Sequence, residues 1–166
     1  MISKSPLETK KLGRTLAGFL RPGDVVTVSG PVGAGKTTLI QAVGKALGVA
    51  SALRSPSFVL IGTHRFRHGR IRTLNHVDLY RIHQLSDHDR RAIAEVLFDR
   101  AAVSLVEWPQ RIRHLLPPTT SRITITMAGE DRRRLVVRGR LASSLAAAWR
   151  ATLPSRISVG PAGSRR

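Results

Sequence analysis

The stretch GPVGAGKTT, Gly30 to Thr38, decides the fold of this 166-residue chain. It fits G-x-x-x-x-G-K-[ST], the pattern of a phosphate-binding loop, at every fixed position. The β-branched run DVVTVS, Asp24 to Ser29, predicts a buried strand directly before it, and a helix is expected from Lys36 to Leu47, where Gly48 stops it. A strand that enters a helix through this loop is the context in which the pattern binds phosphate. A glycine-rich turn with a chance lysine is the alternative.

Each position of the loop has a chemical reason. Gly33, Ala34 and Gly35 allow the backbone to approach phosphate oxygens and to turn its N–H groups toward them. Lys36 would reach the β- and γ-phosphates, and the Thr37 hydroxyl would ligate Mg²⁺. The Thr38 hydroxyl lies either near the phosphates or in an ordinary first helical turn.

A magnesium ion in such a site needs a carboxylate, normally from the end of a neighbouring strand. The chain has ten Asp and Glu residues, and two of them end apolar strands: Asp78 closes LNHVD and Glu107 closes VSLVE. Asp24 opens its strand and so lies at the opposite end. We therefore predict that Asp78 and Glu107 serve the site, the alternative being solvated acids at strand ends.

The overall composition is strongly basic. Lys and Arg number 28 against 10 acids, a formal net charge of +18, which is typical of proteins with a polyanionic partner such as RNA. However, no long basic block or basic–aromatic interleaving is present, so we expect RNA contact, if any, within a larger assembly. The absence of cysteine excludes a disulfide scaffold. The first residues lack the apolar segment of a signal peptide, and no apolar run would cross a membrane, so a cytoplasmic location is expected.

The order of predicted elements is α/β with a mixed sheet. Helices are expected at 6–20, 36–47, 85–100 and 141–153, and strands at 24–29, 58–63, 72–77, 103–106, 123–127 and 135–137. The pairs 58–63 with 72–77 and 123–127 with 135–137 are too close for helical crossovers, so each forms an antiparallel hairpin. The prediction is one domain over 1–153, a P-loop NTPase-like sandwich with a mixed parallel and antiparallel sheet flanked by helices, followed by a disordered tail at 154–166.

Two other classes of P-loop protein fit less well. A GTPase needs D-x-x-G after a strand, and no Asp in this chain is followed by Gly three places on. A small-molecule kinase needs an acceptor pocket and an arginine-bearing lid, for which the segment after Arg81 gives no clear signature. The kinase stays open as an alternative.

The combination of motifs resembles the TsaE (YjeE) family, small P-loop ATPases of bacterial tRNA threonylcarbamoyladenosine biosynthesis. The resemblance covers about Glu8 to Val137. Besides the loop, it is carried by the segments Ser55-Pro56-Ser57-Phe58, His76-Val77-Asp78-Leu79-Tyr80-Arg81 and Val106-Glu107-Trp108-Pro109. The first of these usually reads Ser-Pro-Thr, and Ser57 keeps the hydroxyl of that threonine.

The resemblance implies roles for individual residues. Thr9 and the loop would contact ATP, and Thr37 and Glu107 would ligate Mg²⁺. Asp78 would act near the γ-phosphate. The remaining implied site residues are a switch-like segment (Ser55, Pro56, Ser57 and Phe58), Trp108, the neighbouring Tyr80, and one arginine among Arg132, Arg133 and Arg134, best placed as Arg133.

The resemblance also implies an activity. ATP is hydrolysed without a phosphoryl acceptor, and this turnover supports the cycling of the TsaD and TsaB subunits, which transfer threonylcarbamoyl to an adenosine beside the tRNA anticodon. A non-hydrolysing, ATP-dependent assembly factor is the competing class.

Overall fold

One seven-stranded sheet runs through the part of the chain that the computed structural model describes, residues 1–49, 53, 60–66, 69–82 and 84–152. The strand order is β1-β7-β6-β2-β5-β4-β3. The strands are β1 (Ile2–Ser3), β2 (Val25–Ser29), β3 (Ile61–Arg65), β4 (Thr73–Asp78), β5 (Val103–Glu107), β6 (Ser121–Met127) and β7 (Arg133–Arg138). The pairs β2–β5, β2–β6 and β4–β5 are parallel, and the pairs β1–β7, β3–β4 and β6–β7 are antiparallel. The mixed sheet and both hairpins are confirmed, although Phe58 lies outside the described residues.

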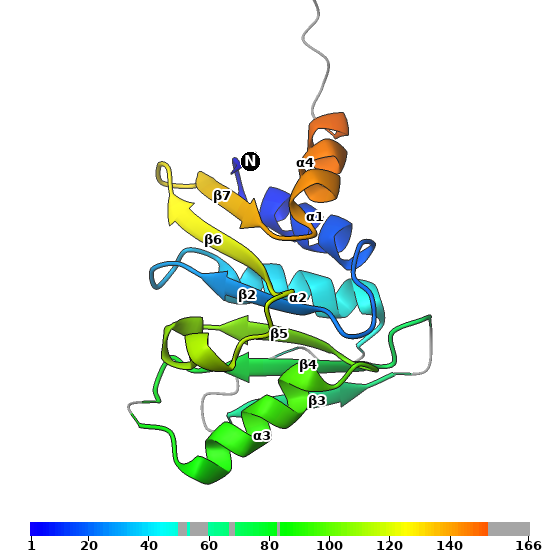
Figure 1. Ribbon diagram of the computed structural model, residues 1–166. Helices are drawn as coiled ribbons and strands as arrows, with labels where there is room; N and C mark the ends of the chain where they lie inside the picture. The colour runs from blue at the N-terminus through cyan, green and yellow to red at the C-terminus, as the bar shows by residue number, and fades with distance from the viewer. Residues whose placement is uncertain (50–52, 54–59, 67–68, 83, 153–166) are drawn as a thin grey trace, which may run out of the picture.

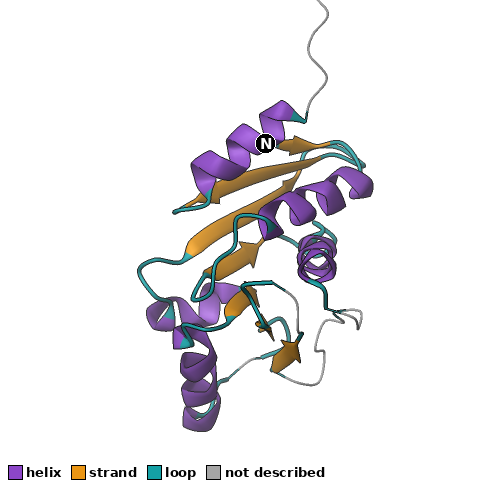
Figure 2. Ribbon diagram, turned by 90° about the vertical axis from the view of Figure 1, so that its right-hand side faces the viewer, coloured by secondary structure: helices purple, strands orange, loops and turns teal. Residues whose placement is uncertain are grey.

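Helices cover the two faces of the sheet unequally. Helices α1 (Pro6–Ala17) and α2 (Lys36–Leu47) pack on one face, as Figure 1 and the side view in Figure 2 show, and α4 (Ala142–Ala151) joins the same core beside α1. Helix α3 (Asp87–Phe98) and the 3₁₀ helix η1 (Pro109–Leu115) pack on the other face, over β4, β5 and part of β2. On that second face no described helix covers β6 and β7.

Alternation along the strands builds the two cores. Val26 and Val28 of β2 face α1 and α2, whereas Val25, one residue away, packs with Ile93 of α3 and Ile112 of η1. Successive side chains of a strand point to opposite faces, so a strand buried on both faces reads as a continuous apolar run. This is why VVTV and VSLV were recognisable as central strands.

Some element boundaries differ from the prediction. The first helix ends at Ala17 instead of Leu20, because the N–H groups of Gly18, Phe19 and Leu20 bond to carbonyls three residues back and tighten the last turn. The two-residue strand β1 and the helix η1 were not predicted. The helix at Lys36–Leu47 begins and ends as predicted. The predicted tail at 154–166 lies outside the described residues.

Within the described residues, no helix combines the length and the apolar character needed to cross a bilayer.

Candidate functional site

The loop between β2 and α2 needs glycine at two of its positions. Gly30 has φ 148°, and a Cβ there would lie 2.1 Å from the carbonyl oxygen of Ile125 on β6. Gly35 caps α2 in the left-handed region, with φ 95° and ψ 20°. Any larger residue at Gly30 would push the loop away from the sheet, and the left-handed turn at Gly35 aims the first N–H groups of α2 into the loop.

The Lys36 side chain is folded back over this loop. Its Nζ donates hydrogen bonds to the carbonyl oxygens of Gly30, at 3.0 Å, and Pro31, at 2.8 Å. The ammonium also lies 4.1 Å from the centroid of the Trp108 ring, a cation–π contact. Burial lowers the pKa of Lys36, and the negative charges of Glu107 and Asp78 oppose this shift. The amine is therefore held among acceptors at the position where a phosphate would replace them.

Trp108 is held in an unusual backbone conformation. Its φ of 57° and ψ of 52° are left-handed, and no other described residue except glycine has a positive φ. The ring packs against Tyr80, with centroids 4.9 Å apart. A bulky residue in this region is strained, and such strain persists where the surrounding structure fixes it, often at functional sites.

Glu107 ends β5 beside the loop and is 2% exposed. The Thr37 hydroxyl lies 3.2 Å from each of its two carboxylate oxygens and donates to that carboxylate. His76 Nε2 lies 3.1 Å from Glu107 Oε1 on the other side. A carboxylate accepts hydrogen bonds, so the tautomer of His76 that can donate in this contact is the one with its proton on Nε2.

The other predicted acid lies next to Glu107. Asp78 on β4 and Glu107 on β5 are register partners in the parallel pair, so both carboxyl groups stand at the edge of the sheet where the loop begins. Asp78 Oδ1 accepts a hydrogen bond of 3.0 Å from the backbone N–H of Tyr80, which turns the chain away from the strand. The structure thus brings these two strand-end acids together beside the loop.

A pocket of about 160 Å³ brings these groups together. It is lined by Val32, Gly33, Lys36, Thr37, Asp78, Tyr80, Glu107 and Trp108. No cluster of three or more His, Asp or Glu side chains that could hold a metal alone is found among the described residues. A cation here would instead be held by the Thr37 hydroxyl and the Glu107 carboxylate together with ligand oxygens, a hard-oxygen set that suits Mg²⁺.

A second pocket, of about 120 Å³, lies on the other side of the same loop. Its lining is Pro6, Thr9, Gly33, Ala34, Gly35, Thr38, Asp131 and Arg133. The buried Thr9 hydroxyl is tied to the Ser3 hydroxyl at 2.8 Å, which fixes α1 against β1. Arg133 Nη2 reaches the Gly33 carbonyl oxygen at 3.4 Å, whereas Arg132 and Arg134 are absent from the lining. The loop backbone therefore separates a pocket rich in carboxylates and hydroxyls from one that Thr9 and Arg133 close.

The structure thus places most of the predicted site residues in the two pockets beside the loop. The exception is the switch-like segment Ser55 to Phe58, which lies outside the described residues. The prediction gave no role to His76, although it is fully buried on β4 with Nδ1 lacking a hydrogen-bond partner among the described residues. The sequence feature that could have pointed to His76 is a polar residue at a buried position of an apolar strand, two residues before Asp78.

Comparisons with known proteins identify a family for this chain. The family model described as "Threonylcarbamoyl adenosine biosynthesis protein TsaE" matches residues 3–136. A tRNA threonylcarbamoyladenosine biosynthesis protein TsaE from Bacillus subtilis is 35% identical over 131 residues, which cover 79% of each chain. The namesake from Treponema pallidum is 30% identical over 136 residues, covering 82% of this chain and 97% of that protein.

A solved structure supports the same grouping. The crystal structure of Bacillus subtilis YdiB superposes with a TM-score of 0.68 at 29% identity, covering 91% of this chain and 93% of that one. The shared fold is that of the P-loop NTPases, with its mixed sheet flanked by helices. The family match extends from Ser3 into β7 and includes the loop, Asp78, Glu107 and Arg133. The chain belongs to the TsaE family of threonylcarbamoyl adenosine biosynthesis proteins.

Proposed function

We propose that this protein binds ATP with Mg²⁺ at the loop and hydrolyses it, as the cytoplasmic ATPase subunit of the machinery that installs threonylcarbamoyl on adenosine beside the tRNA anticodon. The observation that carries the proposal is the meeting of Lys36, Thr37 and the two strand-end carboxylates Asp78 and Glu107 in one pocket beside the loop. The family's place in this tRNA modification supports the biological setting.

The residues divide the work by their chemistry. Lys36 would exchange the carbonyls of Gly30 and Pro31 for the β- and γ-phosphate oxygens, and its charge would offset the charge that builds up during transfer. Thr37 and Glu107 would hold Mg²⁺, which when bound neutralises phosphate charge. Asp78 is the parallel register partner of Glu107 and lines the same pocket, and it would orient the attacking water or the γ-phosphate.

The second pocket would receive the rest of the nucleotide. Thr9 and Arg133 line it, and the Arg133 side chain spans from the β6–β7 turn to the loop. The switch-like residues Ser55 to Phe58, Tyr80 and Trp108 complete the proposed site; of these, Tyr80 and Trp108 form the wall over Lys36.

Phosphate release tests the proposal against its two alternatives. We expect the purified chain with ATP and Mg²⁺ to release phosphate slowly, and the TsaD–TsaB complex to raise that rate. ATP-dependent binding to TsaD–TsaB without phosphate release would instead identify a non-hydrolysing assembly factor. ADP formation with no free phosphate, in the presence of an acceptor, would identify the kinase.

His76 is expected to position Glu107 for the metal. Replacing His76 by Leu removes the donor at 3.1 Å and should raise the Mg²⁺ concentration needed for tight nucleotide binding by about tenfold or more, the usual effect of losing a hydrogen bond to a metal ligand. His76→Gln, which can present an amide N–H at a similar reach, should recover most of the affinity. The measurement is a Mg²⁺ titration of nucleotide binding for both variants. An unchanged Mg²⁺ requirement in His76→Leu would assign His76 to packing alone.

A further inference from the structure

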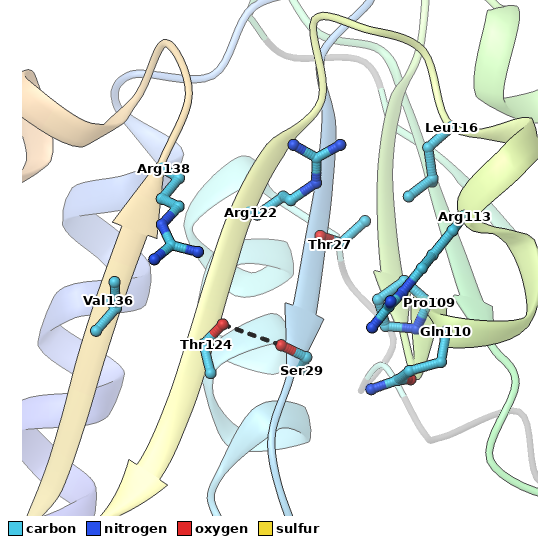
Figure 3. Close-up of a pocket in the computed structure, with 10 residues that line it drawn as sticks. All are labelled: Thr27, Ser29, Pro109, Gln110, Arg113, Leu116, Arg122, Thr124, Val136 and Arg138. Atoms are coloured by element: carbon cyan, nitrogen blue, oxygen red, sulfur yellow. Dashed lines mark hydrogen bonds between the residues drawn. The ribbon is translucent and has the colours of Figure 1, made fainter.

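A hollow on the sheet, separate from the loop, has no part in the proposed ATP site. It measures about 390 Å³ and lies over β6, β7 and the adjoining part of β2, on the face where no described helix covers β6 and β7, and η1 bounds it on one side (Figure 3). Its lining residues are Thr27, Ser29, Pro109, Gln110, Arg113, Leu116, Arg122, Thr124, Val136 and Arg138. We call it the arginine hollow, because three arginines from three different elements line it.

The charge of the arginine hollow is uncompensated. No Asp or Glu belongs to its lining, and no described carboxylate forms an ion pair with Arg113, Arg122 or Arg138. Arg122 on β6 and Arg138 on β7 are direct cross-strand partners. Like charges directly opposite each other destabilise a sheet, so this arrangement does not serve the fold of the isolated chain.

The floor of the hollow adds neutral hydrogen-bonding groups. The Ser29 and Thr124 hydroxyls lie 3.2 Å apart on β2 and β6, and Figure 3 shows them between the arginines of the sheet and the residues of η1. Parallel strands such as β2 and β6 are normally covered on both faces. The bare face, the hydroxyls and the arginines together describe a surface that is complementary to an anionic partner.

The lining favours a protein over RNA as that partner. Pro109, Leu116 and Val136 contribute apolar surface, and Val136 is 44% exposed. Apolar groups combined with arginine are typical of the centre of protein interfaces, where arginine forms bidentate pairs with carboxylates. Single-stranded RNA on a sheet face is held by stacked aromatic rings, and none of the described residues that line the hollow is aromatic.

We propose that the arginine hollow docks an acidic surface of a protein partner, with Asp or Glu side chains of that partner paired to Arg113, Arg122 and Arg138. The identification of this partner with the TsaD–TsaB complex rests on the proposed function. Docking here would place the partner against η1, directly after Trp108 at the ATP pocket.

Matched charge variants test the docking. The hollow variant carries Arg113→Gln, Arg122→Gln and Arg138→Gln. The control variant carries Arg14→Gln, Arg91→Gln and Arg150→Gln, which removes the same charge from exposed helix positions. In titrations of TsaD–TsaB with ATP, the hollow variant should bind at least about tenfold more weakly than wild type, and the control should stay within about twofold. Added salt should weaken wild-type binding more than binding of the hollow variant.

Two further probes separate the possible failures. Phosphate release without partners should be equal in all three proteins, because these arginines lie outside the ATP pocket. If the wild-type chain does not bind TsaD–TsaB at all, the proposed function fails. In that case binding to poly-L-glutamate tests the docking proposal, and weaker binding by the hollow variant, with the control variant unchanged, supports it. Equal losses in both variants, or no loss in the hollow variant, would overturn it. A loss of tRNA binding with TsaD–TsaB binding unchanged would also overturn it, in favour of an RNA surface.

Discussion

The Lys36→Ala variant is expected to lose nucleotide turnover by at least about 100-fold while remaining folded. A single fixed donor at the site of developing charge is commonly worth about 100- to 1000-fold in rate, which is about 3–4 kcal/mol. Lys36 is the residue in the described ATP pocket whose side chain carries positive charge, so no neighbour in that lining replaces it. The measurement is single-turnover phosphate release with TsaD–TsaB present.

The fold should tolerate this change because of what Lys36 contacts. Its Nζ bonds to two loop carbonyls and lies over Trp108, and it takes no part in either apolar core. Lys45→Ala, at an exposed position of the same helix, is the matched control and should keep wild-type turnover. Thermal unfolding of both variants should give similar midpoints. Wild-type phosphate release by folded Lys36→Ala would contradict the assignment of the loop.

The two neighbouring carboxylates are expected to separate into different roles. Glu107 contacts Thr37 and is proposed as the metal ligand, so Glu107→Gln should raise the Mg²⁺ concentration required for tight ATP binding by at least about tenfold. Asp78 is proposed to position water or the γ-phosphate, so Asp78→Asn should leave ATP binding nearly unchanged and slow hydrolysis by about 100-fold or more. Both changes preserve side-chain size.

The measurements are a Mg²⁺ titration of ATP binding followed by single-turnover hydrolysis. A shift of the Mg²⁺ requirement in Asp78→Asn but not in Glu107→Gln would show that the roles are exchanged. If neither variant changed Mg²⁺ dependence or turnover, the ATPase proposal would lose its chemical basis. Asp87→Asn, an exposed acid at the start of α3, serves as the control for the loss of one negative charge.

The parts of the site that could be predicted from sequence are those fixed by local rules. The loop pattern predicts a strand, a turn and a helix in succession. Acids that end apolar strands are expected beside such a loop, so Asp78 and Glu107 were predicted together. The choice of Arg133 depended on register along the β6–β7 hairpin, which the three consecutive arginines left ambiguous in the sequence. In the structure it is Arg133 that reaches the loop carbonyl of Gly33.

Other features depend on contacts between distant segments. The pairing of His76 with Glu107 joins residues 31 positions apart, and the buried run of β4 says nothing about which residue His76 contacts. The strand β1 is two residues long and forms because Ile2 and Ser3 pair with β7, which is distant in the sequence. The left-handed backbone at Trp108 and the arginine hollow likewise depend on how β5, η1, β6 and β7 pack together. No local sequence pattern predicts that packing.

The position of Trp108 gives this site an optical reporter of its own. The chain contains two tryptophans, and Trp149 is buried in the core between the helices and the sheet and lines neither pocket beside the loop. Indole emission depends on the charges and solvent around the ring, and a ligand that draws the Lys36 ammonium from its place 4.1 Å over the Trp108 ring changes both. Trp149→Phe would leave Trp108 as the single tryptophan, so the arrival and departure of nucleotide could be followed in real time by tryptophan emission without a dye.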